Sequence, residues 1–154
     1  ILADTPALKQ MVEAYDKVGG GNLVAVEEVP MEQVHRYGIL DLDQDDGQLA
    51  SAKGLVEKPK KEDAPSNLSI IGRYILQPEI FKNIDKRETG AGGEIQLTDA
   101  IAQLIGPMPF HGVRFDGTRY DCGNKAGFVS ANLAFALARD DLAADVRDAV
   151  SGLL

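Results

Sequence analysis

The sequence has no tryptophan, only one cysteine, few aromatic residues and no long apolar run. The single cysteine, Cys122, excludes an internal disulfide framework and suits a reducing compartment. No apolar stretch approaches the roughly 20 residues that a membrane-spanning helix needs, and the first residues do not follow a signal-peptide pattern. We therefore expect a cytoplasmic protein without a membrane role.

Positive charge is also scarce. Lysine and arginine total 16 against 24 aspartate and glutamate residues, which gives a formal charge of −8. This balance argues against general affinity for nucleic acid or anionic membranes. It does not exclude a small anionic ligand, because a few local lysines can outweigh the overall sign.

The length of 154 residues is enough for one domain with a core of its own. The chain begins at Ile1 rather than at a methionine. Either a start derived from a tag or a missing N-terminal half would explain this, and the motifs below favour the second explanation.

Alternating helix and strand patterns predict an α/β fold. Thr5 and Pro6 are typical of a helix start, and Gly19 to Gly21 of its end. Asp46 and Gly47 predict the turn of a hairpin. Strands are expected at 22–29, 37–43, 48–58, 67–76 and within 110–123, and helices at 6–18, 78–84, 97–105 and, as one or two elements, from 124 onward.

Three stretches imitate known sites without meeting their requirements. In DLDQDDG (41–47), Asp46 stands where a calcium loop needs glycine, so we predict an acidic turn. GAGGEI (90–95) follows a charged stretch instead of a strand, which argues against a dinucleotide site. His35 and His111 have no metal-type spacing to Cys122, and we expect structural or surface roles for them.

Four short stretches lie at or just after the ends of strand-like runs: HRYG (35–38), VEKP (56–59), SNL (66–68) and DCGN (121–124). Ligands of open α/β sheets bind at strand ends, so these stretches are candidates for one rim. Tyr37 and Gly38 offer a backbone N–H that a ligand can approach, although Gly38 is equally compatible with an ordinary strand position.

The pair Glu57 and Lys58 has two readings. It is either a solvated ion pair at a strand end or a pair of ligand-binding groups, one accepting hydrogen bonds and one meeting a phosphate. Adjacent strand residues point to opposite faces, so a shared site requires a break in the strand. Pro59 predicts such a break.

Asp121 lies on a loop before a helix that we expect Asn124 to cap. A carboxylate in this position suits a Mg²⁺ ligand, and a capping or turn role is the alternative.

The order of YG, VEKP, PSNL, GRYIL, GAGGEIQLTDA and DCGNKAGF along nearly the whole chain resembles the C-terminal half of bacterial UTP–glucose-1-phosphate uridylyltransferases. VEKP is shared by sugar-1-phosphate nucleotidyltransferases in general, whereas GEIQLTDAI together with DCGNK resembles the uridylyltransferase branch more specifically. The resemblance implies a Rossmann-like mixed sheet. Residues 1–154 would then be the C-terminal, sugar-phosphate-binding portion of a single catalytic domain.

The resemblance also implies a reaction, in which UTP and glucose 1-phosphate give UDP-glucose and pyrophosphate with the help of Mg²⁺. It implies a homodimer or homotetramer as well. By matching position, Lys58 and Asp121 would carry catalysis, with Lys58 on the sugar phosphate and Asp121 as one of two metal-binding aspartates. The sugar phosphate would be bound by Tyr37, Gly38, Glu57, Ser66, Asn67 and, as a weaker phosphate contact, Lys125.

The family's N-terminal nucleotide-binding portion, with its Gly-rich loop and first aspartate, has no counterpart in the sequence. We therefore expect these 154 residues to be inactive alone and to expose an apolar sheet edge. Two alternatives stay open: another sugar-1-phosphate nucleotidyltransferase, such as a thymidylyltransferase, or a non-catalytic module for sugar-phosphate binding or oligomerisation.

Overall fold

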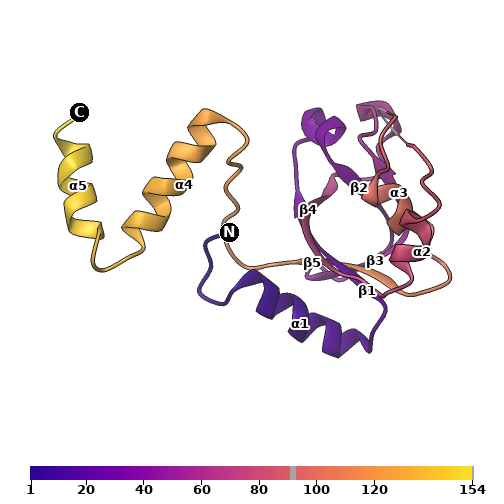
Figure 1. Ribbon diagram of the computed structural model, residues 1–154. Coiled ribbons are helices and arrows are strands. Elements are labelled where there is room, and N and C mark those ends of the chain that lie inside the picture. Colours follow the sequence, from indigo (N-terminus) through magenta and orange to yellow (C-terminus); the bar gives the residue numbers. More distant parts are fainter. Residues whose placement is uncertain (91–92, 154) are drawn as a thin grey trace. The chain divides into compact units, whose positions relative to one another are not determined.

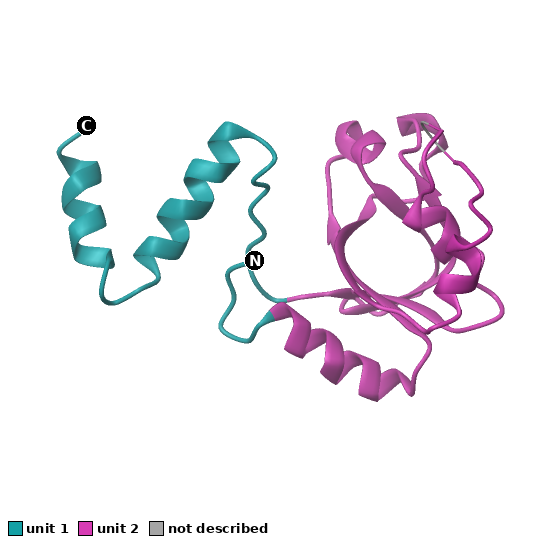
Figure 2. Ribbon diagram, viewed as in Figure 1, with its two compact units in different colours: residues 1–6, 116–154 teal, residues 7–115 magenta. Residues whose placement is uncertain are grey.

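The computed structural model describes residues 1–90 and 93–153, and the chain forms two compact units. The larger comprises residues 7–115, and the smaller comprises residues 1–6 and 116–154 (Figure 2). The expectation that the whole chain is one portion of a catalytic domain stays a prediction.

The larger unit contains most of the secondary structure. The helices and strands confirm the predicted elements with shifts of a few residues at their ends, and two short 3₁₀ helices, η1 and η2, were not predicted. The elements are α1 (Ala7–Val18), β1 (Asn22–Glu28), η1 (Met31–Arg36), β2 (Gly38–Asp45), β3 (Leu49–Glu57), η2 (Lys61–Asp63), β4 (Leu68–Ile75), α2 (Ile80–Ile84), α3 (Leu97–Ala102) and β5 (Phe110–Arg114) (Figure 1).

The five strands form a mixed sheet that closes on itself in the order β1–β4–β2–β3–β5 (Figure 1). Only β1 and β5 are parallel, and the other pairs are antiparallel. Each described strand therefore has a neighbour on both sides, but β2 and β4 pair only at Ile39 and Ser69. The exposed sheet edge that we expected stays a prediction. The α/β class with a mixed sheet is confirmed.

Apolar side chains fill the space inside the closed sheet. Val24, Val26 and Leu40 are fully buried there, together with Phe110 of β5. Gly112 is required by this packing, because a Cβ at that position would lie 2.6 Å from Leu40 Cδ1. A second cluster forms where α1 packs on the outside of the sheet; its buried members are Met11, Leu23, Ala25 and Val113.

The smaller unit contains α4 (Lys125–Leu137) and α5 (Ala143–Ser151). Asn124 caps α4 as predicted, since its side-chain oxygen accepts a hydrogen bond of 2.7 Å from the N–H of Gly127. Leu2 pairs with Thr118 through two backbone hydrogen bonds. Across the described parts of the chain, no helix combines the length and the apolar character that crossing a membrane demands.

Candidate functional site

The ends of three strands meet at one place in the larger unit. The start of β2 pairs with the end of β3, where Gly38 lies opposite Glu57, and Ile39 pairs with Ser69 near the start of β4. Lys58 N donates to Tyr37 O at 2.9 Å. The structure thus brings together the six predicted residues of this unit: Tyr37, Gly38, Glu57, Lys58, Ser66 and Asn67.

The strand breaks between Glu57 and Pro59, as the sequence predicted. Lys58 has a φ of 47°, which is the left-handed region, and Pro59 is buried behind it. The break lets two neighbouring side chains lie on one side, with Lys58 Nζ 3.6 Å from Glu57 Oε1. Backbone strain of this kind in a non-glycine residue costs roughly 1–3 kcal/mol and is concentrated at functional sites.

The exposures of the pair are unequal. The Glu57 side chain is 11% exposed, whereas that of Lys58 is 50% exposed. An ion pair that serves only as a solvated strand end would leave both groups in water. Instead, the carboxylate of Glu57 is mostly sheltered from water, while the ammonium group of Lys58 extends into solvent.

Gly38 lies directly beside this carboxylate. A Cβ at position 38 would be 3.1 Å from Glu57 Oε2, 3.2 Å from Thr98 Cγ2 and 3.3 Å from Thr98 Oγ1. These approaches are closer than ordinary carbon contacts, so the absence of a side chain at Gly38 is what admits both neighbours. Thr98, from α3, was not among the predicted site residues.

Tyr74 of β4 is a further neighbour that sequence reasoning missed. Burial, and secondly the negative charge of Glu57, raise the pKa of the Tyr74 phenol above its usual value. The phenol is therefore protonated at neutral pH, and a hydroxyl donor lies within electrostatic reach of the carboxylate. The alternation of β4 could have shown which face Tyr74 takes, but not what lies opposite that face.

Ser66 and Asn67 hold the backbone of this region. Ser66 Oγ donates to Leu40 O at 2.6 Å and accepts from Leu68 N at 3.1 Å. Asn67 O accepts from Val29 N at 3.0 Å. These bonds fix the start of β4 beside β2 and β1, and direct contact of either side chain with a sugar stays a prediction.

Asp121 and Lys125 belong to the smaller unit. Asp121 is half-buried, and its Oδ1 accepts a hydrogen bond of 2.9 Å from Gly123 N. Lys125 is exposed at the first position of α4. Asp121 therefore sits on a turn fixed by its own side chain, immediately before a capped helix.

The residues that the structure describes contain no group of three or more His, Cys, Asp or Glu side chains that could hold a metal ion. Asp121 offers one carboxylate, which fits a partial metal site and not a complete one. In the acidic turn, the side chains of Asp45 and Asp46 accept hydrogen bonds from the backbone N–H groups of Gly47, Gln48 and Leu49.

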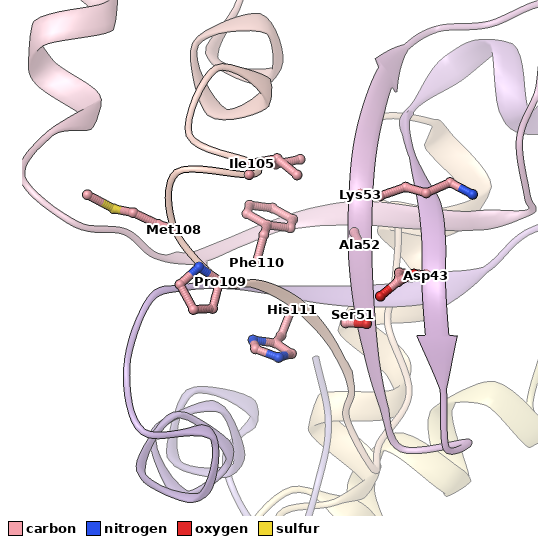
Figure 3. A pocket seen from close by; sticks show the side chains of 10 residues that line it. Asp43, Ser51, Ala52, Lys53, Ile105, Met108, Pro109, Phe110 and His111 are labelled. Carbon is pink, nitrogen blue, oxygen red and sulfur yellow. The ribbon is translucent and has the colours of Figure 1, made fainter.

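A separate pocket of about 460 Å³ lies where β3 meets the segment before β5 (Figure 3). Phe110 and His111 point to opposite sides of β5 there. His111 Nδ1 is buried without a hydrogen-bond partner among the described residues, and burial lowers the pKa of its imidazole. None of the predicted site residues lines this pocket.

A mixed sheet with a Gly–Glu–Lys cluster at its strand ends is consistent with a nucleotide-sugar enzyme, and comparison with known proteins shows the family. The chain belongs to the nucleotidyl transferase family, which it matches over residues 1–137. Nucleotidyl transferases generally use a divalent metal ion.

The individual proteins that resemble this chain have more specific names than the family. The UTP–glucose-1-phosphate uridylyltransferase of Komagataeibacter xylinus is 59% identical over 116 residues, which are 75% of this chain and 40% of that protein. The enzyme of the same name from Bacillus subtilis is 43% identical over 154 residues, 100% of this chain and 52% of its own. A UDP-glucose pyrophosphorylase solved with UDP-glucose is 41% identical with a TM-score of 0.81, over 90% of this chain and 53% of that one. The chain spans about half the length of the curated relatives it matches.

Proposed function

We propose that this chain forms the sugar-phosphate side of a site that makes UDP-glucose and pyrophosphate from UTP and glucose 1-phosphate. The observation that carries the proposal is the broken strand end, where Glu57 and Lys58 lie on one side beside Gly38. The names of the similar proteins supply the substrates.

In this proposal Glu57 accepts hydrogen bonds from glucose hydroxyls, and its sheltered position strengthens those bonds. The ammonium group of Lys58 binds the phosphate of the sugar, whose oxygen then attacks the α-phosphorus of UTP. The new bond joins that oxygen to phosphorus, the bond to the β-phosphate breaks, and pyrophosphate leaves with the electron pair. Positioning and charge stabilisation supply most of the rate in such a transfer.

The remaining predicted residues have supporting roles. Tyr37 and Gly38 place a backbone edge beside the sugar, while Ser66 and Asn67 hold the start of β4. Asp121 would be one ligand of a Mg²⁺ ion, which neutralises phosphate charge when bound. Lys125 is a second candidate for a phosphate contact.

Two neighbouring lysines allow a direct test. In the 154-residue chain we expect Lys58→Ala to weaken binding of glucose 1-phosphate at least roughly tenfold, because a charge-assisted bond to the phosphate is lost. Lys60 is exposed only two residues away, and Lys60→Ala should change the affinity less than roughly twofold.

Isothermal titration calorimetry with glucose 1-phosphate measures both variants. Equal affinities for the two variants would contradict the role of Lys58, since a general effect of positive charge would then explain binding.

A homodimer or homotetramer, a cytoplasmic location and the lack of turnover by the 154 residues alone stay predictions. Four large apolar side chains of α4 are exposed in the smaller unit: Phe128, Val129, Phe135 and Leu137.

A further inference from the structure

The pocket of about 460 Å³ between β3 and the segment before β5 has a volume typical of small-molecule sites, which measure roughly 300–1,000 Å³ (Figure 3). Three of its polar side chains, which we call the polar row, come from neighbouring strands: Asp43, Ser51 and His111. Ser51 pairs with His111 of β5 on one side and with Gln44, the residue after Asp43, on the other. Adjacent strands lie about 4.8 Å apart, so the polar row spans roughly 10 Å across the outside of the sheet.

The polar row has hydrogen-bonding capacity that the protein does not use. Over residues 1–90 and 93–153, His111 makes no hydrogen bond, and Asp43 makes neither a hydrogen bond nor an ion pair. Ser51 Oγ accepts from Gln44 N at 3.1 Å, but no described acceptor takes the proton of its hydroxyl group. Polar groups in a pocket usually have partners, so this row can receive a polar ligand.

His111 contributes a hydrogen-bond donor. Burial lowers the pKa of its imidazole, so the ring is neutral at pH 7 and carries a single N–H group. Nδ1 is buried without a described partner, and buried N–H groups without an acceptor are rarer in proteins than buried acceptors without a donor. We therefore assign the proton to Nε2, where it can be donated into the pocket.

The opposite side of the pocket is apolar and fixed in place. It is formed by Ile105, Met108 and Pro109, from the segment that precedes β5. The fully buried Asn22 ties this segment to β1, since its backbone N–H donates to Pro109 O at 2.9 Å and its Nδ2 lies 3.8 Å from Met108 Sδ. A preformed apolar wall with a thioether suits the face of an aromatic ring.

The charges around the pocket oppose an anionic ligand. Lys53 also lines it, but its Nζ lies 3.5 Å from Asp41 Oδ1, so that the two charges offset each other. Asp43 adds a negative charge that no described cation compensates. The formal charge of the whole chain is −8. A phosphate group would therefore be repelled, whereas an uncharged molecule would not.

We propose that this pocket is a second binding site, for an uncharged aromatic compound of the size of a purine nucleoside. The ring lies against Met108 and Pro109. An amino group on the ring donates to Asp43, and ring nitrogens accept from Ser51 and His111. None of the residues proposed to hold the sugar phosphate lines the pocket, so the inference does not depend on the proposed function.

Adenosine and adenosine 5′-monophosphate are the probes, because they share the ring and differ in charge. Titration calorimetry compares the original 154-residue chain with Asp43→Asn and with His111→Phe. Asp63→Asn is the matched control, since Asp63 is an exposed aspartate of the same unit that does not line the pocket. Asp43 is exposed as well, so Asp43→Asn tests the site even if His111→Phe does not fold.

We expect adenosine to bind the original chain with a Kd below about 1 mM, and the monophosphate to bind at least roughly threefold more weakly. Asp43→Asn and His111→Phe should each weaken binding of adenosine roughly 3- to 10-fold, whereas Asp63→Asn should stay within roughly twofold of the original chain. Asp43→Asn should also narrow the difference between adenosine and its monophosphate, because the repelling charge is then absent.

A competition experiment shows whether the two proposed sites are separate. Saturating glucose 1-phosphate should leave the affinity for adenosine unchanged, and its displacement of adenosine would overturn the second site. Lack of saturable adenosine binding would overturn it too, as would equal affinities of Asp43→Asn and Asp63→Asn. A chain that binds adenosine but not glucose 1-phosphate would contradict the proposed function and leave this pocket's role intact.

Discussion

At the scale of single residues, the site depends on the absence of a side chain at Gly38. Glu57 and Thr98 approach the position where a side chain would begin, and Lys58 adopts a left-handed conformation beside them. The sequence predicted the pairing of Glu57 with Lys58 and the break at Pro59. It could not predict the left-handed φ of Lys58, because a residue before proline usually takes an extended conformation.

Gly38→Ala should therefore damage binding. The added methyl group forces Glu57 or Thr98 to move, and overpacking of this kind typically costs about 1–3 kcal/mol of stability. Because Glu57 is proposed to hold the sugar, we expect affinity for glucose 1-phosphate to fall roughly tenfold. Urea unfolding and calorimetric titration measure the two effects.

Gly54 provides the matched control. It lies opposite Asp41 in the same strand pair, and a Cβ there would be 3.3 Å from Asp41 Cβ. Gly54→Ala should lose a similar amount of stability while keeping its affinity for the sugar phosphate. If both variants lose affinity equally, the crowding around Gly38 has no special connection with binding.

At the scale of elements, Arg114 connects three strands. From β5 it forms two hydrogen bonds of 2.8 Å to the carboxylate of Asp45 at the end of β2, and one of 3.2 Å to Glu28 of β1. The side chains of Arg114 and Asp45 are 23% and 31% exposed, so water screens the pair only in part. This pair supports the closure of the sheet where β5 meets the hairpin.

We expect Arg114→Gln to lower the free energy of unfolding by roughly 1–2 kcal/mol at pH 7. The hydrogen bonds from Arg114 hold the pKa of the Asp45 carboxyl below its ordinary value of 3.8. A lowered folded-state pKa contributes stability above the unfolded pKa, and this contribution is lost as the pH falls through the folded pKa. The difference between the original chain and Arg114→Gln should therefore be constant from pH 7 to about pH 5 and shrink below pH 4.

A second arginine–aspartate pair, which is more exposed, provides the control for Arg114→Gln. Arg139 and Asp141, between α4 and α5, make hydrogen bonds of 2.9 and 2.7 Å, but their side chains are 63% and 62% exposed. Arg139→Gln should lower the free energy of unfolding by clearly less than Arg114→Gln does, because water and salt screen an exposed pair strongly. Equal effects of the two substitutions in urea unfolding followed by circular dichroism would show that the strand connection of Arg114 contributes nothing.

The elements differ in how far the sequence could predict them. The α1 helix, the turn at Asp46 and Gly47 and the cap at Asn124 follow from local signals, and the structure confirms all three. The parallel pairing of β5 with β1 joins residues far apart in sequence, and no local pattern encodes that choice of partner. Thr98 was missed for the same reason, since a helical period shows one apolar face without showing what the polar side meets.

At the scale of the whole molecule, the hydrophobic core belongs to one unit. Among the described residues, the three clusters of buried apolar side chains and the five strands lie within residues 7–115. The proposed sugar-binding residues lie there too, whereas the proposed metal ligand Asp121 does not. The proposed contacts to the sugar thus come mainly from the larger unit, and the proposed contact to the metal comes from the smaller one.

We therefore predict that residues 7–115 fold when expressed alone. Each described strand has two neighbours within this unit, so separating residues 7–115 from the rest of the chain leaves no strand without a neighbour. The isolated unit should show one cooperative thermal transition by circular dichroism, as expected of a single small domain. Glucose 1-phosphate should bind it within roughly threefold of the complete chain, with or without EDTA, because Lys58 and Glu57 need no metal to make their contacts. An unfolded fragment would show that the smaller unit is needed for stability, and a folded fragment whose affinity falls more than tenfold would assign Lys125 or Asp121 a larger part in holding the phosphate.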